Sequence, residues 1–388
     1  MTTPFAPSPE STLLRRLSSI SHLLLVLSGK GGVGKSSVSV QLALSLLASD
    51  PTLKIGLLDV DLTGPSLPRM LGLEGQSVHS SQDGWVPVYL DARVAPDKLG
   101  EGQKVGGGVL SCMSIGFLLK NSTESVVWRG PKKNAMIKQF LGQVRWGQLD
   151  YLIVDTPPGA SSLSLSFLLL SLSLIRVAFF KGTSDEHISL LETLRPLLVD
   201  RPSPSQPLPT LSSLLVSTPQ ALALLDVSKE LSFVRRTKLP LLGLIENMSG
   251  YVCPHCGDVV GIFGQGGGQD FCRIQEEKKD SLVEGEGGGC RFLGRIPIDR
   301  ELVALLDDVA GNSSRKEGGG KVKVLGEDEA ERIRNGAGVG EVEKEQKTLV
   351  ERYREIPSFK VVEGVAKEVR RLIEEQTREE AEKRRRIA

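Results

Sequence analysis

Residues 29–36, Gly-Lys-Gly-Gly-Val-Gly-Lys-Ser, fit the pattern GxxxxGK[ST] that binds nucleotide phosphates. Glycines let successive backbone N–H groups turn toward one anion, and the helix that follows adds the partial positive charge of its N-terminus. Lys35 is expected to reach the β- and γ-phosphates, and the Ser36 hydroxyl to ligate Mg²⁺. The alternative is a glycine turn without a ligand. The predicted nucleotide-binding residues of this loop are Gly29, Lys30, Gly31, Gly32, Val33, Gly34, Lys35, Ser36 and Ser37.

Carboxylates follow two other apolar runs of the chain. Asp59 and Asp61 come after residues 55–58, and Asp155 comes after residues 151–154. Ligands of open α/β sheets bind at the carboxyl ends of parallel strands, so these acids are expected near the phosphate loop, with Asp155 near Mg²⁺.

The chain has five cysteines, and two of them form the motif Cys253-Pro-His-Cys256. An odd and sparse set favours reduced thiols over a disulfide framework. A structural zinc site needs four ligands, and there is no second CxxC motif. A thioredoxin-type motif would open a helix, whereas Gly257 and Asp258 follow here. Half of a shared metal site, zinc, a redox pair and inert thiols therefore remain as alternatives. The remaining cysteines lack pairing spacing and are expected to be packed or free thiols, with Cys272 the one still of interest; they are Cys112, Cys272 and Cys290.

Short apolar runs separated by helical patterns predict the elements that position these residues. Such runs without polar alternation are typical of parallel strands buried on both faces. The predicted fold class is therefore α/β, a doubly wound and mostly parallel sheet of the P-loop NTPase kind. The predicted strands are residues 23–27, 55–58, 151–154, 214–216 and 241–245.

Composition divides the chain into one large domain and flanking segments. Residues 1–19 are expected to be a flexible N-terminus, and 20–310 the NTPase domain, with a proline-rich loop at 201–210. Residues 311–347 are rich in Gly, Glu and Lys, which predicts a disordered linker. Residues 348–388 regain apolar spacing and predict a docking helix with a charged tail.

Charge and hydropathy exclude several classes of partner. The net charge is +1, with 40% hydrophobic and 24% charged residues, so binding to nucleic acid or to an anionic membrane by bulk charge is not expected. The N-terminus lacks the pattern of a secretory signal, which predicts a cytoplasmic protein. The Ser/Leu-rich run at 161–180 is long enough to span a bilayer. It alternates Ser with Leu and contains Arg176, which argues against insertion.

A second lysine early in the phosphate loop, Lys30, resembles the deviant Walker A NTPases of the MinD-like (SIMIBI) class. Further motifs resemble the Mrp/ApbC branch, and within it the eukaryotic cytosolic iron–sulfur cluster scaffold NTPases. The resemblance covers about residues 20–305 and returns at 353–359. No four-cysteine motif precedes the phosphate loop, which matches the smaller of the two partner types. The motifs are DVDLTGPS at 59–66, VWRGP at 127–131, DYLIVDTPPG at 150–159, STPQ at 217–220, ENMSGYVCPHC at 246–256, FGQGGG at 263–268 and LGRIPID at 293–299.

The resemblance implies roles for individual residues. Lys30 would reach across a face-to-face dimer to the partner's phosphates and act with Lys35 in catalysis, as an arginine finger does. Asp61 would orient the attacking water, and Asp59 would join Ser36 and Asp155 around Mg²⁺. Asn247 would contact adenine, and the absence of an NKxD motif favours ATP.

The resemblance also implies a function. Cys253 and Cys256 from two subunits would supply four thiolates for a labile 4Fe–4S cluster. The chain would be an ATP-dependent scaffold with weak ATPase activity, passing clusters to cytosolic and nuclear apoproteins. Its partners would be the larger scaffold NTPase or a second copy of itself, together with iron–sulfur apoproteins and a downstream targeting complex. The alternatives are a MinD/ParA-like positioning ATPase and a nucleotide-gated electron-transfer protein.

One segment departs from the family pattern. Relatives continue DTPPG directly into TSDEH, whereas residues 160–182 separate these two motifs here. This insert is interpreted as a gene-model error or translated intron, or else as a real insertion. A real insertion would displace Asp185 from the γ-phosphate and place ATP turnover in doubt.

Overall fold

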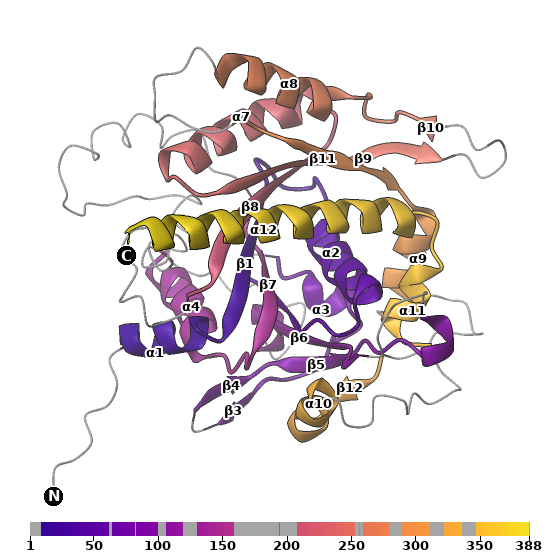
Figure 1. The fold of residues 1–388 in the computed structure, drawn as a ribbon. Helices are drawn as coiled ribbons and strands as arrows, with labels where there is room; N and C mark the ends of the chain where they lie inside the picture. The colour runs from indigo at the N-terminus through magenta and orange to yellow at the C-terminus, as the bar shows by residue number, and fades with distance from the viewer. Residues whose placement is uncertain are drawn as a thin grey trace, which may run out of the picture.

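The computed structural model of the chain describes most of the predicted NTPase domain and the C-terminal segment (Figure 1). The insert at 160–182 and Cys253 lie outside the described residues, so the expectations for them stay predictions. The described residues are 9–61, 64–81, 83–99, 106–118, 130–158, 194, 208–252, 256, 259–279, 289–309, 322–335 and 347–387.

Ten strands of the described residues form one sheet, in the order β10-β9-β8-β1-β7-β2-β6-β5-β12, with β11 beside β9. The pairings from β9 through β6 and between β11 and β9 are parallel, whereas β10, β5 and β12 pair antiparallel at the margins. The prediction of a mostly parallel α/β sheet is confirmed. The strands are β1 (Ile20–Leu27), β2 (Ile55–Asp59), β5 (Val88–Asp91), β6 (Val109–Ser114), β7 (Leu149–Asp155), β8 (Thr210–Ser217), β9 (Leu241–Val252), β10 (Val259–Val260), β11 (Phe292–Ile298) and β12 (Val324–Leu325); a separate hairpin joins β3 (His79–Ser81) to β4 (Gly84–Val86).

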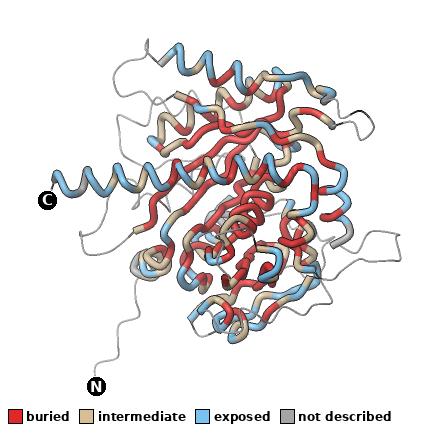
Figure 2. Tube along the Cα trace, turned by 45° about the vertical axis from the view of Figure 1, so that its right-hand side comes forward, coloured by how far each residue is buried: buried red, intermediate tan, exposed pale blue. Residues whose placement is uncertain are grey.

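Helices cover both faces of this sheet, and the central strands lie buried between them (Figure 2). In β1, Leu24 and Val26 join the core on one face, while Leu23, Leu25 and Leu27 join the core on the other. Unbroken apolar runs are therefore buried on both sides. One face carries α2 (Lys35–Ser49), α3 (Leu67–Met70), α9 (Arg300–Val309), α11 (Leu349–Arg354) and α12 (Phe359–Ile387); the other carries α1 (Pro9–Leu17), α4 (Gly130–Gln143), α7 (Ala221–Arg236) and α8 (Gly267–Lys279).

The expectation of a flexible N-terminus is wrong for residues 9–19. They form α1 and the turn that leads into β1, and α1 packs on α4. Leu17 is buried and Leu13 packs against the same core. Apolar residues four apart share one helix face, which gives this short segment something to bury.

The expectation of a disordered linker at 311–347 is wrong for residues 322–335. There β12 adds to the edge of β5, and α10 (Glu327–Arg334) covers that edge. Ala330 and Ile333 are buried against Tyr89, and the Arg334 guanidinium lies 5.1 Å from the Tyr89 ring centroid. The composition of residues 311–347 is polar on average, so it does not reveal that Ala330 and Ile333 are apolar neighbours on one helix. The helix is stable here because these two side chains pack on the sheet.

The C-terminal docking helix is present and longer than its apolar spacing indicated. Helix α12 crosses the strands on one face of the sheet (Figure 1), and its helical conformation continues to Ile387 through the charged tail. Gln376 contributes to its docking, because its Nε2 donates to the Leu211 carbonyl at 3.0 Å and its Oε1 accepts from Ser212 at 2.7 Å. Among the described residues, no helix has the length and apolar character that a membrane crossing requires.

Candidate nucleotide and metal site

The phosphate loop joins β1 to α2 and has a conformation that requires glycine. Gly32 and Gly34 have φ values of 79° and 78°, in the left-handed region that favours glycine. At Gly29 the reason is space, because a Cβ there would collide with the Asp226 backbone of α7. Three glycines of the motif are thus fixed by backbone geometry.

Lys35 forms a buried ion pair with Asp155. Lys35 begins α2 and is 6% exposed; Asp155 ends β7 and is fully buried. The lysine Nζ donates to Asp155 Oδ1, and the Ser39 hydroxyl donates to the same oxygen at 3.2 Å. A phosphate group would compete with Asp155 for this ammonium.

Asp59 lies beside Asp155, because β2 and β7 pair in register at these two residues. Burial is the main cause that raises the pKa of the Asp59 carboxyl to about 8, and the negative charge of Asp155 is the second. Asp59 Oδ2 accepts from the Ser114 hydroxyl at 3.1 Å, so Ser114 on β6 supports the site. Sequence reasoning missed Ser39 and Ser114, although Ser39 lies one turn beyond Lys35.

The residues at this strand end fit Mg²⁺. Asp155 Oδ2 is buried and has no hydrogen-bond partner among the described residues, and Asp59 is its neighbour on the adjacent strand. Carboxylate and hydroxyl oxygens are the ligands that Mg²⁺ takes, usually together with substrate phosphates. Two neighbouring buried acids with an unused oxygen form a donor set that a hard cation would neutralise.

Asp61 lies beyond the end of β2, so strand alternation does not govern its direction. Its backbone N–H donates to Asp59 Oδ1 at 3.0 Å, which makes a turn directly after the strand. The side chain of Asp61 is half-buried, and that of Lys30 is also half-buried. Ser37, in the first turn of α2, is also half-buried, and its hydroxyl accepts from the Gln41 amide at 3.1 Å.

Asn247 joins strand β9 to the phosphate loop. Its Nδ2 donates to the Val33 carbonyl at 2.9 Å, across 214 residues of sequence. The next residue, Met248, has φ 55°, which is unusual for a non-glycine residue. The preceding residue, Glu246, is also buried and accepts from the Gly268 N–H of α8 at 2.6 Å. Glu246 was not predicted, although it stands in the quoted motif ENMS.

Strand β9 continues from this contact toward the CPHC motif. Tyr251 pairs with Val260 of β10 on one side and with Ile298 of β11 on the other. The thiol of Cys256 is exposed beyond this strand. Among the described residues, no three His, Cys, Asp or Glu side chains gather in a metal-binding cluster. Cys112, Cys272 and Cys290 are buried, as expected for packed thiols.

Comparison with known proteins agrees with this geometry. The family model described as a NUBPL iron-transfer P-loop NTPase of the ParA group matches residues 19–178 and 171–325. A cytosolic Fe–S cluster assembly factor, CFD1 of Mycosarcoma maydis, is 52% identical over 76% of this chain, which spans 66% of that relative's length. Human cytosolic Fe–S cluster assembly factor NUBP2 is 43% identical over 75% of this chain and 84% of its own.

One solved structure supports the fold at the level of coordinates. It is a nucleotide-binding protein of Archaeoglobus fulgidus in complex with ADP, with a TM-score of 0.52 and 30% identity. The match covers 79% of this chain and 94% of that one.

Proposed function

Because this chain belongs to the ParA-group family of NUBPL iron-transfer P-loop NTPases, we propose that it is a cytosolic, ATP-dependent scaffold for iron–sulfur cluster assembly. The proposal covers both the nucleotide and the cluster. The chain would build a labile 4Fe–4S cluster together with a second subunit and pass it to cytosolic and nuclear apoproteins. Relatives named as cytosolic Fe–S cluster assembly factors support this assignment.

One structural observation carries the proposal: a single strand connects the nucleotide loop to the cysteine motif. Asn247 of β9 holds the Val33 carbonyl of the phosphate loop, and Cys253 follows the end of the same strand. A change in the loop on nucleotide binding would therefore act on the base of the cysteine motif. Nucleotide-driven loop movement is a common way to switch an interface.

The nucleotide site would work through its buried charges. Phosphate would draw Lys35 away from Asp155, because the ammonium cannot satisfy both groups equally well. Ser36, Asp59 and Asp155 would hold Mg²⁺, which when bound neutralises charge on the phosphate oxygens. Asp61 would orient the attacking water, and Lys30 would complete the site of a partner subunit. Asn247 would contact adenine from the position that it holds beside Val33.

The iron–sulfur cluster would be cargo, held between two subunits. One CPHC motif offers two thiolates, whereas a 4Fe–4S cluster takes four cysteine ligands. A second subunit with an equivalent motif would complete the set, either the larger scaffold NTPase of this family or another copy of this chain. Release would follow opening of that interface, toward apoproteins or a targeting complex.

Anaerobic reconstitution with iron and sulfide tests the cluster assignment. We expect wild type to gain the broad 4Fe–4S absorbance and bound iron, and Cys253→Ala and Cys256→Ala each to lose nearly all of both. Cys112→Ala is the matched control, since Cys112 lies in the core, and it should load like wild type. Full cluster absorbance in both CPHC variants would refute the assignment. Rapid loss of iron to a chelator would separate a scaffold from an electron-transfer protein with a permanent cluster.

A further inference from the structure

Two cysteines outside the CPHC motif lie in contact inside the domain. The Cys272 thiol of α8 donates to the Cys290 sulfur, just before β11, with the two sulfurs 3.5 Å apart. Both side chains are buried, with 3% and 0% exposed. The residues are 18 apart in sequence, and although both are packed thiols as expected, their spacing did not reveal that they touch. The fold brings them together because α8 packs on the strand pair β9–β11.

The sulfur separation suits a disulfide better than a metal site. A disulfide bond is about 2.05 Å long, so the two sulfurs would have to approach by about 1.5 Å to form one. A structural metal site would need further ligands. Among the described residues, no third His, Cys, Asp or Glu side chain completes a metal-binding group around this pair.

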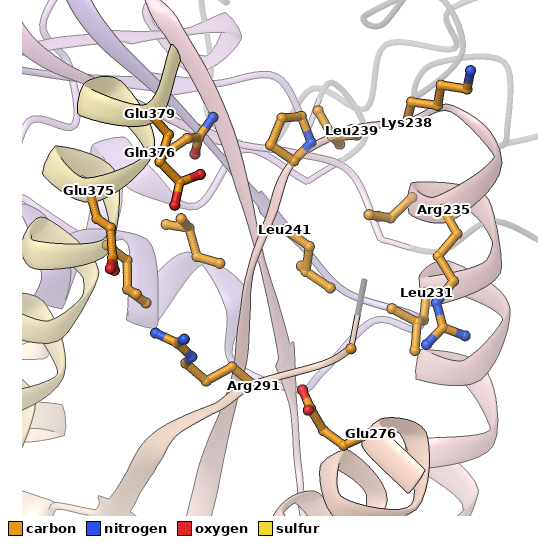
Figure 3. Close-up of a pocket in the computed structure, with 15 residues that line it drawn as sticks. Leu231, Arg235, Lys238, Leu239, Leu241, Glu276, Arg291, Glu375, Gln376 and Glu379 are labelled. Atoms are coloured by element: carbon orange, nitrogen blue, oxygen red, sulfur yellow. The ribbon is translucent and has the colours of Figure 1, made fainter. Parts of the chain in front are cut away.

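The pair lies beside a cavity that small molecules can enter. The cavity has a volume of about 620 Å³ and runs between α7, α12 and the start of β9. Gly289 and Arg291, on either side of Cys290, line it, and so does Glu276, one turn after Cys272. Figure 3 shows Arg291 and Glu276 toward the same end of this cavity. Both neighbours of Cys290 in the chain thus line the cavity, while the two thiols themselves are buried.

The surroundings of the thiols set how they react. The hydrogen bond to Cys290, together with burial, raises the pKa of the Cys272 thiol. A protonated thiol is a poor nucleophile, so this pair resists casual alkylation. Once one sulfur is oxidised, however, the other is already in contact with it.

We propose that Cys272 and Cys290 are a redox-active pair that a hydroperoxide converts to an intramolecular disulfide and that a small thiol restores. In the first step one thiol gives up its proton and its thiolate sulfur attacks the peroxide O–O bond; the hydroxide that leaves takes up that proton, which gives a sulfenic acid and water. In the second step the neighbouring thiol displaces the sulfenic hydroxyl, which forms the S–S bond and a second water. Two thiols and one hydrogen peroxide thus give one disulfide and two waters, with two electrons passing from sulfur to oxygen. The inference does not depend on the proposed scaffold function.

The disulfide would fix α8 to the sheet at a second point. The first turn of α8 is already held there, because Gly268 donates to Glu246 and Arg295 of β11 donates to Gln269 at 2.7 Å. A link at Cys272 would also close the chain between α8 and β11, which reduces the conformational freedom of the unfolded chain. Oxidation should therefore stabilise this part of the domain.

Peptide mapping of peroxide-treated protein tests the proposal. The tryptic peptide with Cys272, residues 239–273, also contains Cys253 and Cys256, so the experiment uses the double variant Cys253→Ser/Cys256→Ser. After a series of hydrogen peroxide doses, remaining thiols are blocked with N-ethylmaleimide in denaturant and the protein is digested without reductant. We expect a cross-linked pair of peptides 239–273 and 280–291 that dithiothreitol separates. This measurement needs no change in the core.

Cys112 is the internal control, because burial also raises the pKa of its thiol, but among the described residues it contacts no second cysteine. It should be recovered without a cross-link at every dose. Adding Cys290→Ala should abolish the link and the rise of several degrees in melting temperature that we expect on oxidation. Recovery of Cys272 and Cys290 as blocked thiols or as unlinked sulfinic acids, or links to other cysteines, would overturn the proposal.

Discussion

At the scale of single residues, the nucleotide site is a small set of buried charges that balance one another. Lys35 faces Asp155, and at the same strand end burial and the charge of Asp155 raise the pKa of Asp59 to about 8. A buried charge that loses its partner destabilises the protein, because it has already lost its hydration and no other group compensates it. The site is therefore built for a cationic and an anionic ligand together, as magnesium nucleotide provides.

Removing Lys35 tests this balance. We expect Lys35→Ala to lower the free energy of unfolding of nucleotide-free protein by about 3–5 kcal/mol, because Asp155 stays buried without a counter-charge. Adding Asp155→Asn should restore much of the loss. Urea denaturation of the single and double variants measures both effects. Lys30→Ala is the matched control, and its half-buried side chain should cost under about 1 kcal/mol. Equal stability of wild type and Lys35→Ala would contradict a structural ion pair.

The half-buried imidazole of His22 leads us to expect that the stability of the protein depends on pH. Burial lowers the pKa of this imidazole, which lies 5.0 Å from the Tyr151 ring centroid; Nδ1 has no hydrogen-bond partner in the part of the chain that the structure describes. The charges of Asp150, Glu374 and Glu380 oppose the shift only in part. A histidine pKa that is lower in the folded than in the unfolded state stabilises above pH ~6.5, and that stability is lost as pH falls.

When the pH is lowered from about 7.5 to 5.5, the melting temperature of wild type should fall. We expect the fall to be smaller in His22→Gln by about 2–4 °C. Scanning calorimetry at the two pH values gives the comparison. His79→Gln, at an exposed site, should follow wild type. Identical pH profiles for wild type and His22→Gln would exclude His22 as the titrating group.

At the scale of elements, one edge of the sheet is covered by residues 322–335, a segment whose composition predicts disorder. Helix α10 and β12 cover the edge of β5 with only a few apolar side chains. An uncovered edge strand presents unpaired backbone N–H and C=O groups to which another chain can bind. This element is small, so it should open more easily than the core.

Ile333→Ala tests the contribution of that cover. The side chain is 4% exposed, so we expect a loss of about 2–4 kcal/mol in local stability. Hydrogen exchange followed by mass spectrometry should show faster exchange at 322–335 and along β5. Glu331→Ala, on the exposed side of the same helix, should leave exchange unchanged. Unaltered protection in Ile333→Ala would mean that the helix is not held by this contact.

At the scale of the whole molecule, the proposed chemistry needs two subunits. Both the Lys30 role and the four-thiolate cluster require a partner, and the described residues of one chain gather no metal-binding cluster. Nucleotide and cluster binding should therefore be coupled to association.

Light scattering after gel filtration measures that coupling. With magnesium and a non-hydrolysable ATP analogue we expect a species of twice the 41.9 kDa chain mass, and with ADP a single chain. Lys30→Ala should bind the analogue yet remain monomeric, because its cation would act on the partner's phosphates. A Lys30→Ala protein that dimerises like wild type would remove the basis for that role.

The sequence alone determined the features built from neighbouring residues. The phosphate loop works through consecutive backbone N–H groups, and the central strands are unbroken apolar runs, so both are visible in order along the chain. Only the tertiary structure decided which distant groups meet: Lys35 with Asp155 across 120 residues, Asn247 with Val33, and Cys272 with Cys290. It also decided that α1 and α10 are ordered, since short segments gain stability only from the surface on which they pack. Such partners meet because of the order of the strands in the sheet and the packing of the helices on it. The periodicity of apolar residues along the chain does not specify that order or that packing.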